Sequence, residues 1–105
     1  MIITRLIYSI KDKDTQLAEG ILDELHEESK IHVDKIGARE MDFVRYIKKH
    51  SIKRFPVIVV TNSDNGIEMK VEGENHFKNR EKLRETLSNM FLKLVYLEPQ
   101  GEKSE

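Results

Sequence analysis

The chain has 105 residues, no cysteine, and 18 Lys and Arg against 19 Asp and Glu, for a formal net charge of −1. This length suits one domain, and the missing cysteines exclude disulfides, thiolate metal ligands and thiol chemistry by this chain. A charge near zero argues against a nucleic-acid binder that works through a basic surface. With 38% hydrophobic and 35% charged residues, the composition indicates a small soluble globular protein with a modest core.

The N-terminal segment carries no targeting signal. Its apolar run, MIITRLIYSI, is interrupted by Arg5 and is too short to span a bilayer. No small-residue cleavage site of a secretory signal follows it. We therefore expect a cytoplasmic protein with no membrane partner.

The first half of the chain alternates strands and helices. Residues 2–10 are β-branched, aromatic and continuously apolar, which is typical of a strand buried on both faces. Asp14 or Thr15 is predicted to cap a helix that runs to about Ser29. Four apolar residues recur in this segment at helical spacing: Leu17, Ile21, Leu22 and Leu25.

A second strand and a short helix follow. Residues 31–36 favour a strand that ends at Gly37. Residues 40–50 are predicted as a helix with a basic end, where the helix dipole favours cations. Its expected apolar face consists of Phe43, Val44 and Ile47.

The second half predicts a hairpin and a long helix. Residues 55–60 (FPVIVV) form the most strongly strand-forming run, with Pro56 at its start. The pair Asn65-Gly66 favours a tight turn into a strand over residues 67–71, which ends at Gly73. A helix with Asn79 as its cap begins near Phe77, and its buried stripe is expected to contain Leu83, Leu87, Met90 or Phe91, and Leu94.

The predicted order is β-α-β-α-β-β-α. Crossover connections make the first pairing parallel, and the hairpin makes the last pairing antiparallel. The sequence therefore predicts an α/β fold in which three helices flank a four-stranded mixed sheet. We expect a single domain over residues 1–97 and a polar, flexible C-terminal tail over residues 98–105.

Two segments carry a resemblance to a known fold. The first is LIYS (residues 6–9), which leads into a turn and a helix. The second is IKRFPVIV (residues 52–59), which leads into a hairpin with Gly66 and Gly73. With this order of elements, residues 2–92 resemble the thioredoxin/glutaredoxin-like superfamily. The resemblance implies that Pro56 is a cis-proline beside the site where the superfamily's redox motif sits.

The redox motif itself is absent. The resemblance places it on Asp12, Lys13, Asp14 and Thr15, where the first position carries a carboxylate instead of a thiolate. Oxidoreductase activity therefore does not transfer to this chain. The glutathione signature is also incomplete, since Arg54-Phe55-Pro56 stands before the strand and Gly73-Glu74-Asn75 after it.

Two segments are candidates for binding at this end of the fold. Residues 12–15 provide either a binding surface or simply a turn that caps a helix. Lys53 and Arg54, with the basic run before them, favour an anionic ligand or an acidic partner, although helix-dipole complementarity explains part of that run. The resemblance further implies that the backbone at Phe55-Pro56 takes up an extended peptide by strand-like hydrogen bonds.

The last helix predicts self-association. Its apolar residues leave the single stripe near the C-terminal end, so its own sheet cannot cover all of them. Either a second copy or another partner covers this segment, or the helix ends early and residues 94–97 fold back; a symmetric dimer is the commonest solution. The interface residues predicted in this way are Phe91, Leu92, Leu94, Val95, Tyr96 and Leu97.

The leading hypothesis is a redox-inactive, non-catalytic adaptor or regulatory module that binds protein partners. The alternative is a glutaredoxin-derived binder of glutathione or another small anionic ligand. A third hypothesis is a regulator similar to the KaiB family, which residues 79–82 and the capped first helix suggest. We rank this hypothesis last. No metal or cofactor is expected, because the four histidines show no ligand spacing.

Overall fold

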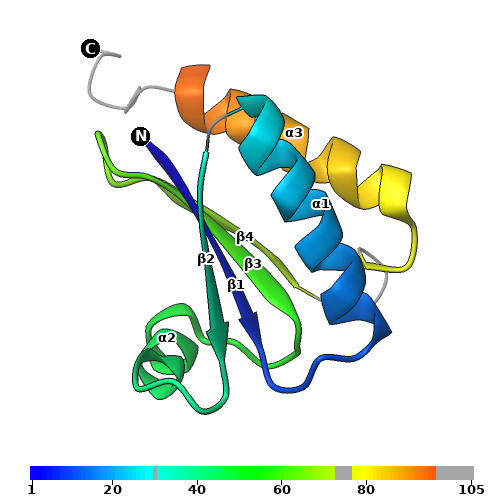
Figure 1. Ribbon diagram of the computed structural model, residues 1–105. Helices are drawn as coiled ribbons and strands as arrows, with labels where there is room; N and C mark the ends of the chain where they lie inside the picture. Colours follow the sequence, from blue (N-terminus) through cyan, green and yellow to red (C-terminus); the bar gives the residue numbers. More distant parts are fainter. Residues whose placement is uncertain (30, 73–76, 97–105) are drawn as a thin grey trace.

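A computed structural model describes residues 1–29, 31–72 and 77–96 of the chain (Figure 1). The elements follow the predicted order β-α-β-α-β-β-α, so the predicted fold class is confirmed. Leu97 and the predicted tail, residues 98–105, lie outside the described residues. The observed elements are β1 (Ile2–Tyr8), α1 (Lys13–Ser29), β2 (His32–Gly37), α2 (Asp42–His50), β3 (Val57–Asn62), β4 (Glu68–Glu72) and α3 (Arg80–Tyr96).

The four strands form one mixed sheet in the order β2-β1-β3-β4. β1 is parallel to β2 and antiparallel to β3, and β3 is antiparallel to β4. α1 and α3 lie side by side over one face of the sheet, whereas α2 lies at the end where β1 and β2 terminate (Figure 1). The hairpin of β3 and β4 follows Pro56 directly.

Two apolar clusters hold the layers together. The larger cluster joins the sheet to α1 and α3, and the smaller one joins the sheet to α2. β3 contributes to both, since residues 57–60 are fully buried. Its uninterrupted apolar run therefore reflects burial on both faces of a central strand.

The buried face of α2 differs from the predicted one. Val44 is 57% exposed, and the residue that α2 buries is Tyr46, at 8% exposure. Phe43 and Ile47 pack beside Tyr46, because residues three and four apart share one face of a helix. Val44 lies about 100° further round the helix than Phe43 and is directed away from the sheet.

The β3–β4 connection is longer than the predicted two-residue turn. The loop spans residues 63–67, with Gly66 in the left-handed region at φ +76°. Its N–H donates to the Asn62 carbonyl at 2.8 Å, and the Asn62 N–H donates to the Ile67 carbonyl at 2.9 Å. β4 consequently begins at Glu68, one residue later than predicted.

α3 begins at Arg80, directly after its predicted cap Asn79 and three residues after the predicted start near Phe77. The Asn79 side chain accepts a hydrogen bond from the Lys82 N–H at 3.0 Å, which confirms it as the cap. Arg84 of α3 forms ion pairs with Glu24 and Glu28 of α1, and its Nη1 lies 3.0 Å from the Glu24 carboxylate. α3 buries one stripe toward the sheet and α1, formed by Leu83, Leu87, Met90 and Leu94.

Candidate functional site

The β1–α1 turn and the loop before β3 meet at the carboxyl end of β1. Ile7 is paired with Val57, so the same antiparallel register, extended by one residue, brings Tyr8 opposite Pro56. We call this surface the Pro56 end and define it as residues 9–13 with residues 53–56. It contains most of the residues for which the sequence predicted ligand binding.

The Phe55–Pro56 peptide bond is cis. Pro56 is buried, and Phe55 is half-buried with its ring stacked on Phe43 of α2 at a centroid distance of 5.4 Å. No described residue forms a hydrogen bond with the backbone N–H or C=O of Phe55. The Pro56 end thus presents a backbone segment with unused hydrogen-bonding capacity beside an aromatic pair.

The β1–α1 turn is a helix cap, and the capping residue differs from the predicted one. The Asp12 carboxylate, and not Asp14 or Thr15, accepts a hydrogen bond from the Thr15 N–H at 2.9 Å. The Thr15 hydroxyl donates to the Ile10 carbonyl at 3.0 Å, and Thr15 is only 1% exposed. Thr15 therefore lies inside the turn and offers no surface to a ligand. Asp12 and Lys13 are exposed and Asp14 is half-buried.

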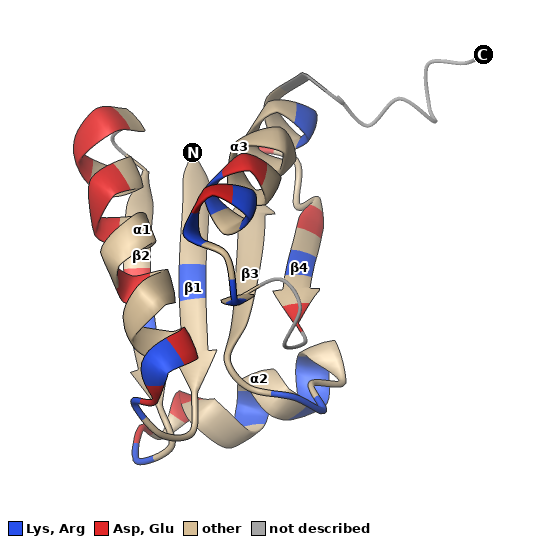
Figure 2. Cartoon of the chain, turned by 90° about the vertical axis from the view of Figure 1, so that its right-hand side faces the viewer, with Lys and Arg blue, Asp and Glu red and all other residues tan. Residues whose placement is uncertain are grey.

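Unpaired cations surround the Pro56 end. Lys53 and Arg54 are exposed, and neither has an ion-pair partner among the residues that the structure describes; the same is true of Lys13. Lys11 differs, because its Nζ lies 3.3 Å from the Glu19 carboxylate. Lys and Arg also gather on α2, whereas α1 carries mainly Asp and Glu (Figure 2). The free positive charge lies next to the Phe55 backbone.

A charged cluster that the sequence did not indicate ties α2 to the sheet. The His50 ring stacks on the Tyr46 ring. The guanidinium of Arg5 also lies over the Tyr46 ring, 5.3 Å from its centroid. The backbone carbonyl of His50 accepts a hydrogen bond from the Lys70 side chain at 2.6 Å. The Nδ1 atom of the His50 ring lies 3.7 Å from the Glu68 carboxylate. Burial, assisted by the nearby cations, lowers the pKa of His50 below 6.5, although Glu68 opposes this shift.

The lowered pKa of His50 predicts a pH-dependent stability. The unfolded chain binds the proton at its ordinary pKa near 6.5, whereas the folded protein binds it only at lower pH. The stabilisation that neutral His50 contributes is therefore complete above pH 6.5 and is lost as the pH falls below that value. We expect the unfolding free energy of the wild type to fall more steeply than that of His50→Gln between pH 7 and pH 5. Denaturant titrations at several pH values measure both slopes, and parallel profiles would contradict this role of His50.

The predicted α3 interface is only partly on the surface. Leu94 is 1% exposed and belongs to the larger core cluster, so its assignment to an oligomer interface is corrected. Phe91 is half-buried and packs against the same cluster. Leu92 and Val95 are 54% and 49% exposed and remain candidates. The side chain of Tyr96 and residue Leu97 lie outside the described part of the chain.

Within residues 1–29, 31–72 and 77–96, no three or more Asp, Glu or His side chains lie close enough together to hold a metal ion. In the same part of the chain, no helix has the length and apolar character needed to cross a membrane.

Comparison with known proteins identifies the fold. No family model matches the sequence, and no curated protein matches it. Thioredoxin O2 from Arabidopsis thaliana is 12% identical, with a TM-score of 0.66 over 85% of this chain and 74% of that one. Chloroplastic thioredoxin z is 19% identical, with a TM-score of 0.64 over 88% and 80% of the two chains. The thioredoxin Deadhead of Drosophila melanogaster is 20% identical, with a TM-score of 0.61 over 89% and 80%.

These similarities, with the sheet order and the cis-proline, define a protein of the thioredoxin-like fold. More particularly, it is a protein of this fold whose sequence contains no cysteine. The thioredoxin O2 structure represents an oxidized state, whereas the present chain has no thiol that could form a disulfide. At the start of α1, where the resemblance placed the redox motif, Asp12 caps the helix instead.

Proposed function

We propose that this protein is a redox-inactive interaction module that binds an extended acidic segment of a partner protein at the Pro56 end. The observation that carries the proposal is the Phe55 backbone, which has no hydrogen-bond partner among the described residues. An extended segment that lies alongside Phe55 can satisfy these groups with strand-like hydrogen bonds. Such binding requires no cysteine.

The charge of the Pro56 end supports an acidic partner. Lys13, Lys53 and Arg54 are exposed and have no ion-pair partners in the described part of the chain. Carboxylates of the partner would gain charge-assisted hydrogen bonds there, mainly with the guanidinium of Arg54. The stacked pair Phe43 and Phe55 adds an apolar contact beside these charges.

A second candidate function is binding of a small anionic ligand such as glutathione. The same unpaired cations favour it, because a short peptide with two carboxylates also carries the complementary charge. The two candidates differ in the length of ligand that is required. An extended protein segment would lie alongside the Phe55 backbone and cover the whole Pro56 end. A tripeptide would occupy only part of the Pro56 end.

An NMR titration of the labelled protein distinguishes these candidates. The probes are a nonapeptide of alternating Glu and Val residues and, separately, glutathione. We expect saturable shifts of the Phe55 amide with the nonapeptide, and a dissociation constant that rises about five- to tenfold in Arg54→Glu. Lys82→Glu is the matched control, because it makes the same charge change at an exposed position of α3. Its affinity should remain that of the wild type.

The possible outcomes separate clearly. Saturation by glutathione alone would support the second candidate over the first. Equal loss of affinity in Arg54→Glu and Lys82→Glu would show that only net charge matters, which contradicts a site at the Pro56 end. The absence of saturable shifts at Phe55 with either probe at millimolar concentration would exclude both candidates.

A further inference from the structure

The outer edge of β4 has unused backbone hydrogen-bonding groups. β4 is the last strand in the sheet order, and no described strand pairs with its outer edge. The hydrogen bond from the Asn62 N–H to the Ile67 carbonyl sets the alternation of the β3–β4 ladder. The odd-numbered residues of β4 consequently direct their backbone groups toward β3. The residues whose N–H and C=O groups face the free edge are Glu68, Lys70 and Glu72.

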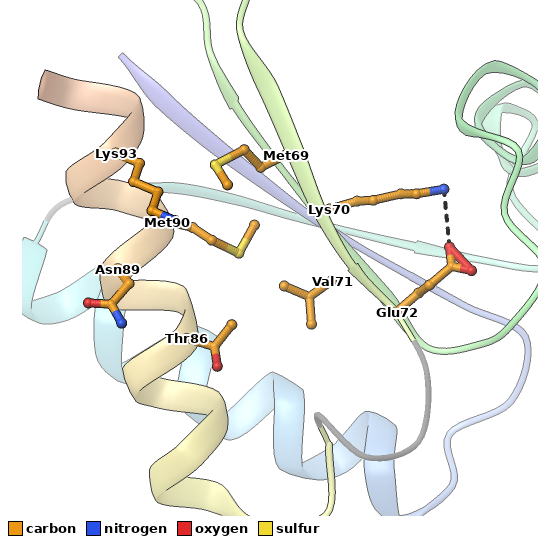
Figure 3. Close-up of a pocket in the computed structure, with 8 residues that line it drawn as sticks. All are labelled: Met69, Lys70, Val71, Glu72, Thr86, Asn89, Met90 and Lys93. Carbon is orange, nitrogen blue, oxygen red and sulfur yellow. Dashed lines mark ion pairs between the residues drawn. The ribbon is translucent and has the colours of Figure 1, made fainter. Parts of the chain in front are cut away.

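A groove runs along this edge between β4 and α3 (Figure 3). Met69, Val71 and Met90 line its apolar floor, and the polar side chains of α3 form one wall. The side chains of Lys70 and Glu72 point away from the groove, toward the opposite face of the sheet, where their ion pair spans 3.2 Å. The edge therefore has an apolar side and a charged side.

We propose that a second copy of this chain occupies this edge, with the two β4 strands antiparallel about a two-fold axis at Met69. In this register, Glu68 of each copy lies opposite Lys70 of the other, so that two ion pairs form on the charged side. Both residues direct their backbone groups to the free edge, so the same two positions also exchange the backbone hydrogen bonds. The resulting dimer contains one continuous eight-stranded sheet.

The apolar side is complementary in the same register. Met69 of one copy lies opposite Met69 of the other, at the mouth of the groove that Met90 lines. Ile67 lies opposite Val71 on each side of this central pair. Methionine adapts its shape readily, which suits a contact at a two-fold axis. The pattern of β4 thus matches itself on both faces of the sheet.

The charges select this register over its neighbour. An axis at Lys70 would place Lys70 opposite itself and Glu68 opposite Glu72, and like charges in directly opposite positions are destabilising. The pattern of β4 also favours a second copy over an unrelated segment. The alternation of charged and apolar residues that would complement β4 is already present in β4 itself. This inference does not rest on the proposed function, since it involves no residue of the Pro56 end.

Two charge-reversal variants test the pairing. Glu68→Lys places lysine opposite Lys70, and Lys70→Glu places glutamate opposite Glu68, so each variant alone should weaken self-association by about tenfold or more. Mixing the two variants restores opposite charges at both positions. We expect the mixture to form a heterodimer with about the wild-type dissociation constant, as measured by analytical ultracentrifugation. If the axis lay at Lys70, Glu68→Lys would instead strengthen the dimer, which would overturn the register.

Hydrogen exchange of the wild type provides a readout without any substitution. This readout is needed because Glu68 also accepts a hydrogen bond from Thr61 at 2.9 Å, so its replacement can affect folding. We expect the amides of Glu68 and Lys70 to become protected as the protein concentration rises, while other edge amides on β2 do not. A monomer at millimolar concentration would overturn the proposal. So would a dimer that Leu92→Asp abolishes while these two amides exchange freely.

Discussion

Replacing Leu94 by alanine is expected to lower the free energy of unfolding by about 3 kcal/mol, and the same change at Leu92 by less than about 0.5 kcal/mol. Both leucines lie near the end of α3, two residues apart. Leu94 is 1% exposed within the larger core cluster, whereas Leu92 is 54% exposed. Removing the Leu94 side chain leaves a cavity between α3 and the sheet, and chemical denaturation measures the loss for both variants.

The protein concentration distinguishes a core residue from an interface residue. If Leu94 stabilises the single chain, its replacement costs the same free energy at every protein concentration. If it stabilised a dimer, the loss would grow with protein concentration, because association contributes to apparent stability by mass action. Equal losses for Leu94→Ala and Leu92→Ala would contradict the position of Leu94 in the core.

Much of the fold follows from local sequence patterns. The apolar run after Pro56 predicted a strand, and its residues 57–60 are fully buried. The spacing of the leucines in α3 predicted its buried stripe, and Asn79 was recognised as its cap. These features depend on the period of a helix or strand and on the chemistry of one side chain, so the sequence alone reveals them.

The errors concern choices among neighbouring residues. Asp12, Asp14 and Thr15 can all cap a helix, and only the observed backbone shows that Asp12 accepts the hydrogen bond while Thr15 turns inward. At α2, an aromatic residue with a polar tip, Tyr46, takes the buried position instead of Val44. A small rotation of α2 decides which of its residues is buried, and the hydrophobicity of the residues does not reveal that rotation.

The charged cluster around His50 depends on strand register, which the sequence did not supply. Arg5, His50, Glu68 and Lys70 come from three separate elements and meet only because β1, β3 and β4 pair as they do. The self-complementary edge of β4 likewise appears only once its hydrogen-bonding direction is known. The Pro56 end was predictable in outline because the resemblance placed the proline and the missing cysteines at the same end of the sheet.

Asn62 explains why the end of α3 is closer to the core than its composition indicated. Asn62 is 8% exposed, and its side-chain amide donates to the Leu94 carbonyl at 2.9 Å, which ties the last turn of α3 to β3. Its side-chain oxygen also accepts a hydrogen bond from the Asp64 N–H at 2.9 Å. We expect Asn62→Ala to lower the free energy of unfolding by about 2 kcal/mol, because it removes both bonds and leaves a buried carbonyl without this donor.

Asn65→Ala is the matched control for this prediction. Asn65 lies in the same loop, and its side chain accepts one hydrogen bond, from the Ile67 N–H at 3.0 Å, without reaching α3. Its replacement should cost about 1 kcal/mol or less. Amide exchange in the last turn of α3 should accelerate in Asn62→Ala and remain unchanged in Asn65→Ala. If both variants lost the same stability and kept the same exchange in α3, the bond to Leu94 would not hold this helix against the sheet.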